Sequence, residues 1–261
     1  MSNWAIVTGS TSGIGKSFCE LLASIGYNLI TVARNVDHLN DDAILLSKKF
    51  GIDVRIWCCD LSSPKELANL SEFITEFDQN IEVLVNNAGF GINSTFLESE
   101  ASRQAEMINT MIMAPMQLTH SAGLKMKERS KGFIINISSV AGFMAGSTYC
   151  AAKSWLNVFT ESIHEDYNQS GVNVHAICPG FTRTDFHKRC NQDVSGVPDF
   201  FWLTSDYVVK KAWEQVLKGK PMSVPTFHYK ILVAIHQFAP RWLVIVYGKT
   251  AKAFLARSKK V

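Results

Sequence analysis

The stretch Thr8-Gly9-Ser10-Thr11-Ser12-Gly13-Ile14-Gly15 decides the fold of this chain. Residues 4–7 before it are apolar, as in a buried strand, and residues 16–22 after it have the spacing of an amphipathic helix. The glycines predict a tight turn that a pyrophosphate can approach closely, at a helix N-terminus with unpaired N–H groups and partial positive charge. The stretch therefore predicts a nucleotide-binding turn. A turn that only packs the helix on the strand is the alternative.

A second predicted strand, residues 27–33, is followed at once by Arg34. In dinucleotide-binding folds this strand end faces the adenosine ribose, where an acidic residue binds the 2′-hydroxyl and an arginine accepts a 2′-phosphate. Arg34 lies 19 residues after Gly15, which favours NADP(H) over NAD(H). A solvated loop arginine is the alternative, and Asp37 is a weaker candidate for the opposite preference.

Further strand-like segments alternate with helical ones along the chain. The remaining predicted strands are residues 54–59, 81–85, 132–137, 172–177 and 222–227. A long helix is predicted over 98–128, with a kink or interruption at Pro115, and another over 204–217. Alternation of this kind predicts an α/β fold, a doubly wound and mostly parallel seven-stranded Rossmann sheet with helices on both faces.

Tyr149 and Lys153 are four residues apart and therefore share one face of a predicted helix. Reduction of a carbonyl by hydride needs a proton for the developing alkoxide, and a phenol with a pKa of about 10 is a poor acid near neutrality. An adjacent ammonium is expected to lower that pKa, while the Ser139 hydroxyl at the end of the fifth strand can hydrogen-bond the substrate oxygen. The three side chains predict acid–base chemistry at a carbonyl.

Five motifs occur in order over residues 4–227 and together resemble the short-chain dehydrogenase/reductase (SDR) superfamily. They are TGxxxGIG at 8–15, Asp60, NNAG at 86–89, Ser139 with YxxxK at 149–153, and Pro179-Gly180 with Thr184. The resemblance implies an oxidoreductase that interconverts a carbonyl and an alcohol on an apolar substrate such as a lipid, a steroid or an acyl derivative. Its catalytic residues would be Ser139, Tyr149 and Lys153, with Asp60 near the adenine unless it only caps the helix that begins near Pro64.

The same resemblance implies a set of residues that hold the nucleotide, which we expect to be NADP(H). They are Gly9, Ser12, Gly13, Ile14, Gly15, Arg34, Asp60, Leu61, Asn87, Ala88, Gly89, Tyr149, Lys153, Pro179, Gly180, Thr182 and Thr184.

The sequence departs from the family pattern in two places. Met111 stands where many members carry a catalytic asparagine, and Asn109, two residues earlier, is given no catalytic role because it is out of register. Tyr149 follows Ser139 by ten residues, three fewer than in most relatives. These departures support an alternative function, an NADP-binding scaffold or sensor with weak or no turnover.

Length and composition suit one catalytic domain with an extension. Residues 1–227 are predicted to form the domain, including a substrate lid at about 185–206, and residues 228–261 a helical extension. The six cysteines show no C-x-x-C pair and no metal-ligand spacing, which predicts reduced thiols, no metal site and a cytoplasmic protein. Only two residues precede the first predicted strand, so no signal peptide is expected. A homodimer or homotetramer is expected.

The lid and the extension are rich in aromatic side chains. Phe186, Phe200, Phe201 and Trp202 indicate either an apolar substrate or a lid buried against the body. Nine lysines and arginines and no acidic residue follow Glu214, whereas the net charge of the whole chain is +3. The segments 229–238 and 240–257 could therefore lie on an anionic membrane surface, or pack over the lid or against a second subunit. No nucleic-acid motif accompanies the charge.

Overall fold

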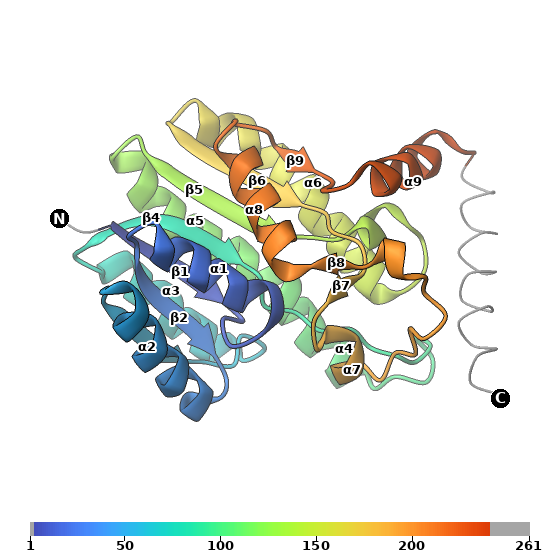
Figure 1. Cartoon of the computed structure of the whole chain (residues 1–261), viewed down its shortest axis with the longest axis horizontal. Helices are drawn as coiled ribbons and strands as arrows, with labels where there is room; N and C mark the ends of the chain where they lie inside the picture. The colour runs from blue at the N-terminus through green and yellow to red at the C-terminus, as the bar shows by residue number, and fades with distance from the viewer. Residues whose placement is uncertain (1–2, 241–261) are drawn as a thin grey trace.

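The computed structural model describes residues 3–240, and its centre is a seven-stranded parallel sheet (Figure 1). The strand order is β3-β2-β1-β4-β5-β6-β9. The bounds are β1 Asn3–Thr8, β2 Asn28–Ala33, β3 Val54–Cys58, β4 Asn80–Asn86, β5 Gly132–Ile137, β6 Val172–Ile177 and β9 Met222–Ser223. The predicted Rossmann sheet is confirmed. Its last strand is shorter than the predicted 222–227, because Pro225 interrupts it and a helix begins at Phe227.

Helices cover both faces of this sheet (Figure 1). They are α1 Gly13–Ser24, α2 Val36–Phe50, α3 Pro64–Glu76, α4 Ala101–Ile108, α5 Ala114–Glu128, α6 Thr148–Asn168, α7 Phe186–Arg189, α8 Ser205–Val216 and α9 Phe227–Phe238. None of the helices in the described part of the chain is long and apolar enough to cross a bilayer.

Alternating side chains of β1 fill two cores, one on each face of the sheet. Ala5 and Val7 pack in the core that α1 and α8 cover, and Trp4 and Ile6 pack in the core that α3 and α5 cover. Because the strands are parallel, the loops that follow them all lie at the carboxyl edge of the sheet, beyond the two cores.

The helix predicted over 98–128 is continuous but changes its winding. Between α4 and α5 the chain forms a π-helical turn, η1 (Asn109–Met113). Pro115 lies in the first turn of α5, a position that tolerates its missing N–H. The irregularity therefore lies before Pro115, at η1, and such turns are frequent at functional sites.

A buried amide network ties the central strands to the helices behind them. The Nδ2 of Asn86 donates to Asn136 Oδ1 at 2.8 Å and to Thr119 Oγ1 at 3.1 Å, and Asn136 Nδ2 donates to Thr160 Oγ1 at 2.9 Å. Asn136 is completely buried. Water cannot reach these buried groups, so they depend on one another for hydrogen bonds. The network therefore fixes β4, β5 and α6 relative to one another.

We expect Asn136→Ala to lower the free energy of unfolding by about 2–4 kcal/mol, because two buried hydrogen bonds and the packing of a completely buried side chain are lost. Urea denaturation followed by circular dichroism measures the change. Asn168→Ala, at an exposed position near the end of α6, is the control and should shift stability by less than about 0.5 kcal/mol. Equal midpoints for the two variants would contradict the role given to the network.

Candidate active site

Ser139 lies two residues after the end of β5, where the chain enters a 3-10 turn, η2 (Val140–Phe143). Its Oγ accepts a hydrogen bond from the Ala141 N–H at 3.1 Å and donates to the Pro179 carbonyl at 3.4 Å. The second contact joins the ends of β5 and β6. The hydroxyl is thus held at the carboxyl edge of the sheet, near the phenol of Tyr149.

Tyr149 is in the first turn of α6, which begins after the N-cap Ser147, whose side chain accepts from the Cys150 N–H. The ring is partly buried and lies 5.6 Å from the Phe186 ring of the lid, centroid to centroid. Burial raises the pKa of the phenol, and the nearby Ser139 hydroxyl opposes that rise only in part. Tyr149 is therefore protonated near neutral pH and can donate a proton.

Lys153 lies one helical turn after Tyr149 and is buried. Its Nζ donates to the Ile137 carbonyl at 2.6 Å and is 5.8 Å from the centroid of the Tyr149 ring. Burial lowers the pKa of the ammonium to about 8. The prediction that Lys153 lowers the pKa of Tyr149 is wrong for this structure. Nζ is directed at a backbone carbonyl, and the largest effect on the pKa of the phenol is its burial, which raises it.

A buried polar pair supports Lys153 from behind. Ser138 donates to the side-chain oxygen of Asn157 and also contacts the Lys153 carbonyl at 3.2 Å. Gly142 lies against the same helix, since a Cβ on it would come within 2.6 Å of Asn157 Nδ2. These contacts fix the first turns of α6, and hence Tyr149 and Lys153, against β5 and η2.

The turn between β1 and α1 adopts a conformation that requires glycine. Gly9 has a positive φ of 64°, and a Cβ on Gly15 would stand 2.2 Å from the Gly9 carbonyl. Asn87 fixes the turn to the end of β4, because its Nδ2 donates to the carbonyls of Thr8 at 2.9 Å and Gly9 at 3.1 Å. The structure thus brings the predicted turn and the predicted NNAG segment together.

The N-terminus of α1 fits an anionic group such as a pyrophosphate. Ser12 stands at the N-cap but its side chain makes no capping hydrogen bond, and the first turn contains no acidic residue. The N–H groups of Gly13 and Ile14 therefore keep the donor capacity that an anion needs. Thr184 comes to the same place from the loop after β6, since its Cγ2 would lie 2.9 Å from a Cβ on Gly13.

Arg34 and Asp60 lie at the ends of neighbouring strands, β2 and β3. The Arg34 side chain is exposed, and its guanidinium has no hydrogen-bond or ion-pair partner among residues 3–240. Asp60 accepts from the N–H and the hydroxyl of Ser62, while Ser63 is the residue that caps α3. The alternative that Asp60 caps this helix is wrong, and the adjacent Leu61 is buried in the core.

The remaining predicted nucleotide residues form backbone around the edge. Ala88 donates its N–H to Thr8 Oγ1 at 3.1 Å, Gly89 faces the Met111 thioether, and Thr182 bonds the Gly180 carbonyl at 3.0 Å. These contacts hold the loop ends in place. None of these contacts tests nucleotide binding, so the binding role of each residue stays a prediction.

Tyr229 of α9 is a residue of this region that sequence reasoning gave no role. Its ring covers Gly180, where a Cβ would come within 1.8 Å of it. Its hydroxyl accepts from the Phe181 N–H at 2.9 Å and donates to the Phe201 carbonyl at 2.8 Å. Gly180 thus makes room for a tyrosine, and α9 packs over the lid, as one of the two predictions for residues 229–238 states.

Three contacts hold the lid against the rest of the chain. Its short strand β8 (Leu203–Thr204) pairs with β7 (Thr182–Arg183), which lies just before the lid, and Asp199 of the lid forms an ion pair with Arg183 at 2.7 Å. Cys190 Sγ accepts from the Gly91 N–H at 3.1 Å, which joins the lid to the loop after β4. Of its four predicted aromatic side chains, three are partly buried and Phe200 is exposed, so the lid is buried against the body only in part, and the apolar substrate stays a prediction.

Met111 is buried in η1, in a small cluster with Met107 and Ala152 against which the Tyr149 ring packs. Asn109 Nδ2 donates to the Ser62 carbonyl at 2.9 Å, which turns it toward α3. The position where relatives carry an asparagine therefore holds an apolar side chain beside the candidate acid, and Asn109 does not replace it.

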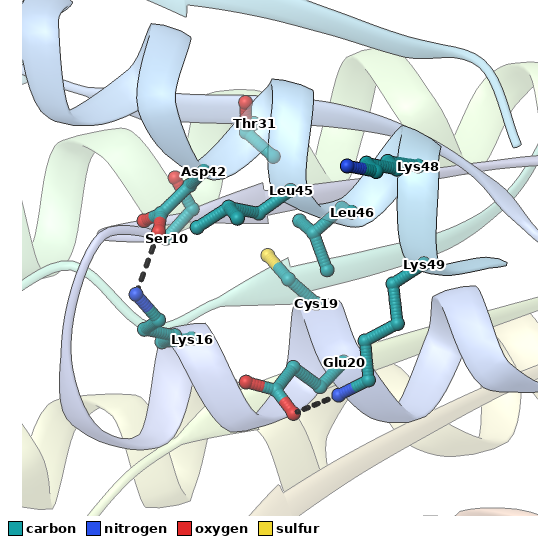
Figure 2. Close-up of a pocket in the computed structure, with 10 residues that line it drawn as sticks. All are labelled: Ser10, Lys16, Cys19, Glu20, Thr31, Asp42, Leu45, Leu46, Lys48 and Lys49. Atoms are coloured by element: carbon teal, nitrogen blue, oxygen red, sulfur yellow. Dashed lines mark hydrogen bonds and ion pairs between the residues drawn. The ribbon is translucent and has the colours of Figure 1, made fainter.

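A cavity of about 520 Å³ lies between α1 and α2, beside the glycine turn (Figure 2). Ion pairs cross it from Lys16 to Asp42 at 2.6 Å and from Lys49 to Glu20 at 3.4 Å. The Cys19 thiol lies at its floor, where burial raises the pKa of the thiol and keeps it protonated. This cavity contains none of the three candidate catalytic side chains.

Comparison with known proteins agrees with this geometry. Residues 3–195 match the family model described as short chain dehydrogenase. The chain is 29% identical to a very-long-chain 3-oxoacyl-CoA reductase of Rattus norvegicus, over 97% of this chain and 80% of that protein. It is 32% identical to an (S)-acetoin-forming diacetyl reductase of Staphylococcus epidermidis, over 76% of this chain and 79% of that one. A solved short-chain dehydrogenase from Sphingobium yanoikuyae in complex with NADPH is similar with a TM-score of 0.82 and 26% identity, over 97% of this chain and 95% of that one.

Proposed function

The chain belongs to the short-chain dehydrogenase/reductase family of oxidoreductases, and from this membership we propose that it is an NADP(H)-dependent reductase of an apolar carbonyl compound. One observation carries the proposal. A protonated tyrosine, a hydrogen-bonded serine and a buried lysine meet at the sheet edge that also carries the glycine turn. The side chains that can donate a proton or a hydrogen bond therefore lie together at the edge where a dinucleotide would bind.

Each of the three side chains has a distinct task in this proposal. When bound, the nicotinamide supplies the hydride for the carbonyl carbon. Tyr149 donates its proton to the oxygen on which negative charge develops, and Ser139 hydrogen-bonds that oxygen and orients the carbonyl. Lys153 holds the ribose hydroxyls with its ammonium.

The preference for NADP(H) is proposed from Arg34, an exposed guanidinium without a partner in the described part of the chain, next to the strand end that faces the adenosine ribose. The relative from Sphingobium yanoikuyae was solved with NADPH, which is consistent with this proposal. A phosphate accepts two parallel hydrogen bonds from such a group.

We expect Arg34→Glu to raise KM for NADPH about 10- to 100-fold while KM for NADH changes little, because one charge-assisted contact is replaced by repulsion. Initial rates with each nucleotide, monitored at 340 nm, measure the change. Arg129→Glu, an exposed arginine at the end of α5, is the matched control. A parallel loss with both nucleotides would count against a 2′-phosphate contact.

The substrate is proposed to be an apolar carbonyl compound of lipid, steroid or acyl type. The lid brings the rings of Phe186 and Tyr149 together and places Phe181 5.5 Å from Trp202. A very-long-chain 3-oxoacyl-CoA reductase is among the relatives, which places acyl compounds first in a substrate panel.

Met111 favours a second candidate function, a scaffold or sensor that binds the nucleotide without turnover. The two functions separate in one experiment, in which NADPH fluorescence gives binding and a panel of aldehydes, ketones and 3-oxoacyl thioesters gives oxidation at 340 nm. Turnover with any apolar member of the panel supports the reductase. Saturable binding with no turnover across the panel supports the scaffold.

A further inference from the structure

One face of α9 carries a row of large apolar side chains that the enzyme does not cover. The row consists of Phe227, Ile231, Ile235 and Phe238. These side chains are between 46% and 86% exposed, and their spacing of four, four and three residues places them on one side of the helix. The opposite side packs on the body through Tyr229, which is only 2% exposed.

The row continues onto the lid. Phe200 is 65% exposed, and its ring lies 6.1 Å from the ring of His228 in the first turn of α9. The hydrogen bond from Tyr229 to the Phe201 carbonyl links the same two elements. We call these five exposed side chains, Phe200 and the row on α9, the α9 patch. In Figure 1, α9 lies at the same end of the long axis as α4 and α7, on the side of the lid.

The charge of α9 and of the sequence after it has a single sign, and Asp199, the acidic neighbour of Phe200 on the lid, is paired with Arg183. Lys230 is exposed on α9 beside the row, and the chain after Glu214 has nine lysines and arginines and no acidic residue. An exposed apolar row flanked by basic residues is the combination that binds the interface of an anionic bilayer. A second copy of the chain is a poorer occupant, because a symmetric contact would bring two copies of α9, each with Lys230 and no acidic residue, together.

We propose that the α9 patch docks the protein on the surface of a lipid bilayer containing anionic lipids. Phe227, Ile231, Ile235 and Phe238 then enter the boundary between headgroups and acyl chains, and the basic residues contact the headgroups. Docking in this way brings the lid against the bilayer. If the proposed function is correct, an apolar substrate can pass from the lipid directly under the lid.

Flotation with vesicles tests the docking on the full-length protein. The vesicles are phosphatidylcholine with and without phosphatidylserine. We expect the wild type to float with the anionic vesicles and much less with the neutral ones. The variant Ile231→Ser/Ile235→Ser should float at least about tenfold less, since two apolar side chains that would enter the bilayer are removed. The control Ile44→Ser/Leu45→Ser changes two apolar residues of α2 that are at least as exposed, and it should float like the wild type.

Two outcomes would overturn the proposal. One is that the wild type does not float, or that the Ile231→Ser/Ile235→Ser variant floats as well as the wild type. The other is a variant that floats normally but has a smaller mass in light scattering, which would assign the patch to a contact between subunits. Thermal melting of each variant shows that it is folded. Flotation needs no substrate, so its result stands whether or not the protein turns over a carbonyl.

Discussion

Tyr149→Phe is expected to lower kcat for carbonyl reduction by about 10³-fold while the Kd of NADPH changes less than about threefold. The substitution removes only the hydroxyl that donates the proton, and positioned acid catalysis contributes about 10²- to 10⁴-fold. The ring, with its contact to Phe186, remains, so the fold and the lid should be unaffected. Stopped-flow hydride transfer, measured at saturating substrate, separates this loss from changes in binding.

The matched control for this substitution is Tyr207→Phe, which removes a hydroxyl that donates to the Pro225 carbonyl at 3.1 Å, away from the three candidate side chains. It should keep full turnover. Ser139→Ala should lose about 10²-fold, because the hydrogen bond to the substrate oxygen goes but the proton donor stays. If Tyr149→Phe keeps the wild-type rate with a substrate that the enzyme accepts, Tyr149 is not the acid.

The seven-stranded parallel sheet and the grouping of the candidate site residues at its edge could be predicted because both depend on local signals. Short apolar runs alternate with amphipathic ones, and the glycine turn needs conformations that few other residues adopt, as the positive φ of Gly9 shows. Polar groups such as Asn87 and Ser139 follow predicted strands, and parallel strands bring their ends to one edge. The predictions for the fold and the family are therefore confirmed, while the role of each site residue awaits mutation.

Long-range packing could not be predicted in the same way. The contact of Tyr229 with Gly180 joins residues 49 positions apart, and no spacing in the sequence relates them. The pKa of Tyr149 depends on how completely the folded chain removes the ring from water, which the motif does not specify. The exposed row on α9 has helical periodicity, but periodicity alone does not tell which face of a helix meets the body.

Lys153→Met is expected to lower kcat/KM by about 10²-fold or more and to abolish a pH dependence of NADPH binding that the wild type should show. In the free protein the pKa of Lys153 is about 8, because the ammonium is buried. Hydrogen bonds from the ammonium to a bound ribose favour the charged form, so binding raises this pKa. Between about pH 8 and the raised value, the Kd of NADPH should increase by up to tenfold per pH unit; below pH 8 it should be constant.

Fluorescence titration of NADPH between pH 6.5 and about 9.5 measures this dependence, a range that spans the pKa of the free lysine. Lys125→Met is a close control, because Lys125 also donates to a backbone carbonyl, that of Thr75 at 2.8 Å, and burial also lowers its pKa. That variant should keep the wild-type profile even if it is less stable. A profile that rises equally in Lys153→Met and the wild type would assign the titration to another group and remove Lys153 from the nucleotide contacts. A flat profile in the wild type would mean that the ammonium is stabilised equally in the free and the NADPH-bound protein, since only a difference between the two can shift its pKa on binding.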